Sequence, residues 1–146
     1  MTFAELFAEA EEPEIEVDGR RLSQVFRDDL TCARLRIDRI RATTSRRQGL
    51  VLDADVDLIV DGRGAPRLVL WSDSAPETVD IEVDGPTEIR VWNVWSDHGM
   101  TQAWVGWASI HVETDDEVTR LTCTDGHTHS ADEPADLVVE LTRVDA

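Results

Sequence analysis

Hydrophobic positions at the start of the chain follow a helical period. Apolar side chains recur at intervals of three and four residues: Phe3, Leu6, Phe7 and Ala10. Thr2 and Glu5 have the spacing of a capping box, and Pro13 is expected to end the helix. The pattern therefore predicts an amphipathic helix over residues 2–11, with its apolar face packed on the rest of the protein.

The pattern beyond Pro13 is typical of β-strands. Valine, isoleucine and threonine make up about a quarter of the chain, and short runs rich in them are separated by turn residues such as Asp-Gly pairs. The expected strands are 14–18, 20–27, 33–42, 50–60, 67–72, 78–84, 87–96, 101–114, 118–124 and 136–144. The intervals leave no room for crossover helices, so the strands should be antiparallel. We predict one all-β domain over residues 1–146, an antiparallel β-sandwich (jelly-roll-like or barrel-like) with the short N-terminal helix.

Residues 30–42 fit two patterns. Leu30, Ala33, Ile37 and Ile40 have helical spacing, whereas Leu35 and Ile37 alternate with charged residues as in a strand. Because the neighbouring segments are strands, we favour a strand with a bulge near Asp38.

Four of the five tryptophans lie between residues 87 and 112. The predicted strands 87–96 and 101–114 flank Asp97-His98-Gly99, a good hairpin signal. Strict alternation places the more apolar residues on one face, our expected core: Ile89, Val91, Asn93, Trp95, Met100, Gln102, Trp104, Ala108, Ile110 and Val112. The opposite face then carries Arg90, Trp92, Val94, Ala103, Val105, Trp107, Ser109 and His111.

This second face is the candidate binding surface, with Arg90, Trp92, Trp107 and His111 as its site residues. Tryptophan and arginine are enriched at protein interfaces, which favours a protein partner or self-association. Two other interpretations stay open. The face could be covered by another layer of the fold, or its tryptophans could stack sugar rings, an arrangement that resembles a carbohydrate-binding module.

Charge restricts the class of partner. The 146 residues hold 31 acidic and 14 basic side chains, giving a net charge of -17. Nucleic acids and anionic membranes need a basic surface, so neither is an expected partner. Residues 20–47 hold nine arginines and three aspartates, a local excess of positive charge that either pairs within the chain or docks an acidic partner, including a second copy.

A histidine cluster near the C-terminus suggests different chemistry. The spacing of His127, His129 and Glu133 resembles the first metal motif of the cupin family, which implies a metal-binding enzyme. Leu121 stands where that motif has a glycine, and no histidine follows Glu133. An exposed polar loop is therefore the preferred interpretation. Cys32 and Cys123 lie in alternating apolar segments and are interpreted as buried, reduced thiols.

These observations lead to two functional hypotheses. The leading one is a non-enzymatic, acidic binding or protein-interaction domain of bacterial type, without a cofactor, whose working surface lies on the tryptophan-rich hairpin. The alternative is a cupin-like metal enzyme using His127, His129 and Glu133. The N-terminus has no positively charged leader and no long apolar run is present, so we expect a cytoplasmic protein.

Overall fold

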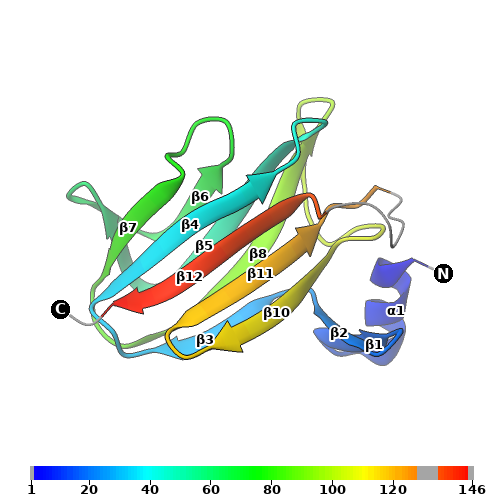
Figure 1. Cartoon of the computed structure of the whole chain (residues 1–146), viewed down its shortest axis with the longest axis horizontal. Helices are drawn as coiled ribbons and strands as arrows, with labels where there is room; N and C mark the ends of the chain where they lie inside the picture. The colour runs from blue at the N-terminus through cyan, green and yellow to red at the C-terminus, as the bar shows by residue number, and fades with distance from the viewer. Residues whose placement is uncertain (1, 128–134, 145–146) are drawn as a thin grey trace.

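The computed structural model describes residues 2–127 and 135–144. Within them, one helix and twelve strands follow in order: α1 (Phe3–Ala10), β1 (Glu14–Val17), β2 (Arg20–Ser23), β3 (Phe26–Leu30), β4 (Arg34–Ala42), β5 (Arg47–Val60), β6 (Arg63–Trp71), β7 (Thr78–Val83), β8 (Thr87–Asp97), β9 (Met100–Gln102), β10 (Ser109–Asp115), β11 (Val118–Thr124) and β12 (Leu137–Val144). Figure 1 shows the helix with β1 and β2 at one end of a curled sheet.

The N-terminal helix α1 forms as its sequence predicts. The Glu5 amide donates to Thr2 Oγ1 at 3.3 Å, and the Glu5 carboxylate lies 3.4 Å from the Thr2 amide, so the capping box is confirmed. Phe3 and Phe7 are buried against Leu22 of β2, which docks the helix on the β1–β2 hairpin. No helix among the described residues has the length and apolar character needed to cross a membrane.

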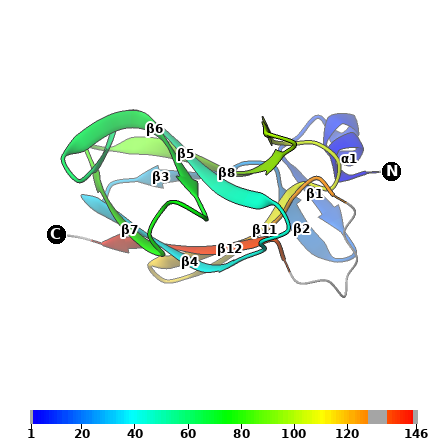
Figure 2. The ribbon, with the colours of Figure 1, turned by 90° about the horizontal axis from the view of Figure 1, so that it is seen from above.

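The strands of the described residues form one hydrogen-bonded sheet. Its order is β1-β2-β10-β11-β12-β4-β7-β5-β8-β3, with β6 beside β5 and β9 beside β8. The sheet curls like a half-barrel, so that β6, β5, β8 and β3 lie over β7, β4, β12 and β11 (Figure 2). The all-β prediction is confirmed. The finer prediction of a sandwich is not confirmed, because strand β5 belongs to both halves of a single sheet.

Strand β5 carries the sheet from one half to the other. Its residues 47–54 pair with β8, whereas Leu58 and Ile59 pair with β7. Between these parts the register with β6 shifts, so that residues 54–57 lie opposite Pro66 alone. Proline has no N–H to donate and is tolerated at edge strands and bulges, and extra residues in one strand bend it. The sequence around Pro66 therefore accommodates the bend of β5.

Buried apolar side chains fill the space between the two halves. Within the main apolar cluster, those with at most 1% exposure are Leu35, Leu52, Leu58, Ile81, Ile89, Val91, Ile110, Leu121 and Cys123. The ambiguous segment 30–42 contains strand β4, as favoured. Arg39 and Arg41 pair with successive residues of β12, so Ile40 is the extra, bulged residue, two positions beyond Asp38.

Two predicted strands are interrupted. Residues 20–27 divide into β2 and β3, and residues 101–114 divide into β9 and β10. The break between β9 and β10 contains two residues with positive φ, Trp104 at 58° and Gly106 at 58°, and a strand cannot continue through that conformation. The prediction of one continuous strand over 101–114 is therefore wrong, although the turn at His98 and Gly99 between β8 and β9 is confirmed.

Candidate functional site

Strand β8 separates an inner from an outer face as alternation predicts. Ile89, Val91, Asn93 and Trp95 point into the core, with Trp95 only 1% exposed. Arg90, Trp92 and Val94 therefore lie on the outer face of the half formed by β6, β5 and β8. Each has a direct neighbour on β5: Asp53 beside Arg90, Val51 beside Trp92, and Gly49 beside Val94.

Tryptophans gather on this outer face from three segments. The ring of Trp104, in the segment after β9, lies 5.1 Å from that of Trp92. Trp71 of β6 lies against Gly49, where a Cβ atom would come within 2.8 Å of the Trp71 ring. We name the cluster the outer tryptophan patch, and its members are Val51, Val69, Trp71, Trp92, Val94 and Trp104. Trp104 and Val69 are each 43% exposed, so part of this apolar surface faces solvent.

Two arginines lie on the rings of the patch. The Arg47 guanidinium is 4.2 Å from the Trp71 ring centre, and the Arg67 guanidinium is 5.2 Å from that of Trp92. These distances are typical of cation–π contacts. With Arg67 and Trp104 both packed on it, Trp92 is only 8% exposed.

Arg90 lies beside the patch and is surrounded by acids. Its guanidinium contacts Asp55 at 3.1 Å, Asp53 at 2.8 Å and Glu88 at 3.1 Å. Hydrogen bonds to Asp55, Asp53 and Glu88, in that order, raise the pKa of Arg90 above its ordinary value. Burial opposes the ionisation of Asp53, but hydrogen bonds from Arg90 and Arg67 outweigh it and lower the pKa of Asp53. The charge of Arg90 is thus compensated within the chain.

The structure does not bring the four predicted site residues together. Arg90 and Trp92 lie at the outer tryptophan patch. Trp107 instead packs edge-on against Phe3 of α1, with ring centres 4.9 Å apart. His111 lies on β10, where its Nδ1 is 3.2 Å from the Arg21 carbonyl oxygen. A common face for all four is therefore wrong, because alternation does not continue from β9 into β10.

The expected core face of the hairpin is also partly wrong. Its β8 residues and Ile110 are buried, but Met100 is 67% exposed and Trp104 is 43% exposed. Sequence reasoning missed that Trp104 turns back over Trp92, and that Arg67, Val69 and Trp71 share the outer face. The alternation of these three with the inward Leu68 and Leu70 is the signal that could have found them.

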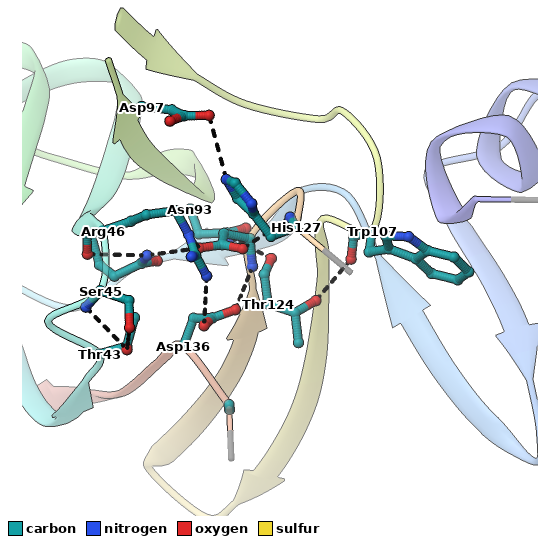
Figure 3. A network of polar contacts seen from close by, with 12 residues as sticks. Thr43, Ser45, Arg46, Asn93, Asp97, Trp107, Thr124, His127 and Asp136 are labelled. Atoms are coloured by element: carbon teal, nitrogen blue, oxygen red, sulfur yellow. Dashed lines mark hydrogen bonds and ion pairs between the residues drawn. The ribbon is translucent and has the colours of Figure 1, made fainter. Parts of the chain in front are cut away.

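The metal hypothesis rests on residues of which only one is described. His129 and Glu133 lie outside the described residues. The His127 Nε2 atom is 3.4 Å from an Asp97 oxygen, and its amide donates to Asp125 at 3.0 Å (Figure 3). Residues 2–127 and 135–144 hold no group of three side chains placed to bind a metal ion. A metal site that includes His127 therefore stays a prediction.

Figure 3 shows a polar network next to His127 that the sequence did not predict. The Asp125 side chain is 1% exposed and accepts hydrogen bonds from Arg46 at 2.6 Å and Gln48 at 3.0 Å. The hydrogen bond to Asp125 is the main reason that the pKa of Arg46 is raised. The Asp125 amide donates to Asp136 at 2.9 Å, so the network joins β5 to the ends of β11 and β12. We assign it a structural role.

A hollow of about 730 Å³ lies between α1 and the β1–β2 hairpin. Apolar and acidic residues line it: Leu6, Ala10, Ile15, Glu9, Glu12, Glu14 and Glu16, together with Arg21. Arg21 is paired with Glu14 at 2.6 Å. This surface is distant in sequence from the tryptophan-rich hairpin, and its acidic rim favours basic over acidic partners.

The cysteines do not form a reactive site. Cys32 and Cys123 are both buried, as the alternating pattern predicted. Burial, with a smaller contribution from Asp136, raises the pKa of the Cys123 thiol well above its ordinary value. The thiol therefore stays protonated near neutral pH, and a thiolate is the form that acts as a nucleophile.

Known proteins give no further guide to the role of these residues. Comparisons with protein-family models, with curated proteins and with solved structures found no match.

Proposed function

We propose that this chain is a non-enzymatic protein-interaction domain whose partner packs on the outer tryptophan patch. The observation that carries the proposal is the half-exposed Trp104, which packs on Trp92 in a patch that also includes the equally exposed Val69. Interfaces favour aromatic anchors surrounded by a polar rim that excludes water. Here Arg47, Arg67 and Arg90 supply that rim.

The ring geometry favours a protein over a sugar. A sugar stacks on the free face of an aromatic ring. Trp71 has the Arg47 guanidinium 4.2 Å from its ring centre and Gly49 against a ring edge, while Trp92 carries both Arg67 and Trp104. Trp104 alone retains a large exposed surface, which suits an apolar anchor point better than a sugar-binding platform.

Charge supports a partner with an apolar contact surface. The three rim arginines are already paired, Arg47 with Asp73 at 2.7 Å, Arg67 with Asp53 at 3.1 Å, and Arg90 with its three carboxylates. Their positive charges are therefore already compensated and do not favour a phosphate-rich partner. The net charge of -17 also disfavours nucleic acids and anionic membranes. Two buried cysteines suit a reducing compartment, so we include a cytoplasmic location in the proposal.

Paired variants test the proposal. Trp104→Ala removes the exposed anchor, while Met100→Ala removes an exposed apolar side chain of β9 and serves as the control. Both proteins and the wild type are immobilised and exposed to an extract of the cells that produce the protein. We expect a defined partner to bind the wild type and the Met100 variant, and to bind the Trp104 variant at least about tenfold more weakly. A partner retained equally by all three would contradict the proposal.

Two further measurements address the alternatives. Retarded migration of the protein in gels containing soluble polysaccharides, lost in Trp104→Ala, would replace the protein partner with a carbohydrate. Stoichiometric transition metal in the purified protein, lost in His127→Ala, would favour the cupin-like metal enzyme.

A further inference from the structure

Strand β6 is an open edge of the sheet. Among the described residues it pairs with β5 alone. Other edge strands are short or charged: β1 has four residues including two glutamates, β9 has three, and β3 reads Phe-Arg-Asp-Asp-Leu. Such features are the usual protection against pairing with another chain. The part of β6 after Pro66 lacks it, since its only charged residue is Arg67.

The hydrogen bonds between β5 and β6 define which backbone groups are available. The Ser72 amide donates to the Gln48 carbonyl at 2.8 Å, in the same register that pairs Gly49 with Trp71. Hydrogen-bonded pairs alternate along an antiparallel ladder, so Leu70 and Leu68 also bond to β5. The N–H and C=O groups of Val69 and Arg67 therefore point away from β5, toward the open edge.

We propose that β6 pairs in antiparallel orientation with β6 of a second copy of this chain, centred on Val69. This goes beyond the interaction at the patch and does not depend on it. With Val69 opposite Val69 of the second copy, the two residues exchange both N–H···O bonds. The same register places Arg67 opposite Trp71 of the second copy on the outer face, where an arginine and an indole attract one another. No like charges face each other across the five paired positions 67–71.

The chain limits this pairing at both ends. Pro66 has no N–H, and the Trp71 carbonyl accepts from the amides of Ser74 and Ala75 in the turn that follows β6. Pairing over positions 67–71 alone buries a small area, so we expect a weak dimer rather than a fibre. Figure 2 shows β6 along the outside of the molecule, where a second copy has access to it. The two Val69 side chains would then join the outer tryptophan patches of the two copies.

Disulfide crosslinking tests the register. In a hydrogen-bonded antiparallel pair the opposed Cα atoms are about 5.5 Å apart, within the range that a disulfide spans. Val69→Cys should therefore form a crosslinked dimer under mild oxidation. In Arg67→Cys the Cα atoms of the two cysteines would be roughly 14 Å apart, so crosslinking should be at least about tenfold slower. Equal crosslinking of the two variants, or faster crosslinking of Arg67→Cys, would overturn the proposal. Cys32 and Cys123 are buried and do not interfere.

Sedimentation equilibrium tests the dimer without a covalent bond. The wild type should associate reversibly at high micromolar concentration. Val69→Pro removes the N–H that faces the open edge and leaves the β5 ladder intact, so it should weaken association at least about tenfold. Val69→Thr keeps both backbone groups and should still dimerise. A wild type that remains monomeric at millimolar concentration, or a proline variant that associates as strongly as the wild type, would refute the inference.

Discussion

Replacing Gly106 with alanine should destabilise the fold more than the same change at Gly62. Both glycines have positive φ, 58° and 78°, a conformation that costs an alanine about 1–2 kcal/mol. At Gly62 nothing lies within 4 Å of the added Cβ, so this conformational cost is all that we expect. At Gly106 the Cβ would lie 2.2 Å from the backbone carbonyl oxygen of Gly126, which cannot rotate away.

Relief of that overlap requires the two backbone segments to separate. The Trp107 amide donates to the Gly126 carbonyl and the Ala4 amide to the Gly106 carbonyl, so separation weakens the docking of α1 as well. Overpacking of this kind adds about 1–3 kcal/mol, giving roughly 2–5 kcal/mol for Gly106→Ala against about 1–2 for Gly62→Ala. Urea unfolding monitored by circular dichroism measures both. Equal losses would show that the close approach of residues 106 and 126 does not exist in solution.

Three further predictions follow from burial and ion pairing. Trp95→Ala should lower the free energy of unfolding by about 3–5 kcal/mol. Trp104→Ala should lower it by only about 1 kcal/mol, chiefly through the lost contact with Trp92. Equal losses in urea unfolding of the two variants would contradict this ranking. Deletion of residues 1–12 removes the buried Phe3 and Phe7 and should lower the melting temperature by several degrees in calorimetry. An unchanged melting temperature would mean that α1 is not docked on the β1–β2 hairpin. The pKa of Asp53 is lower in the folded than in the unfolded protein, so its contribution to the free energy of unfolding is complete above roughly pH 5 and is lost as pH falls through its folded pKa. Asp53→Asn should therefore reduce the change of the urea midpoint between neutral and acidic pH. An unchanged pH profile would exclude this contribution.

The elements of this fold were predictable where the signal is local. Thr2 and Glu5 lie within one helical turn, and the turn between β8 and β9 has its own sequence signature, so both were found. The order of the strands depends on contacts between distant residues. Nothing near Pro66 in the sequence shows that β5 leaves β8 for β7 at this point, and alternation alone does not distinguish one curled sheet from two separate ones.

The face on which each side chain lies was predicted correctly only along β8. Alternation separates Arg90 and Trp92 from the buried Trp95 because β8 is a regular strand. It fails after Gln102, where the positive φ values of Trp104 and Gly106 interrupt the strand. Gly106 between two tryptophans was the available signal, since glycine within an apolar strand often marks a bend. The pair Arg46 and Asp125 carries no such signal, because 79 residues separate the two.

The outer tryptophan patch stabilises the sheet and forms the proposed binding surface with the same residues. Trp92 is covered by Trp104 and Arg67 and is 8% exposed, so its removal would disturb folding before binding could be measured. The sequence predicted the opposite arrangement, with Trp92 on the binding face and Trp104 in the core. Trp104 reaches the patch from a segment between strands, and much of its surface already faces solvent. For this reason Trp104, and not Trp92, is the residue whose substitution separates binding from stability.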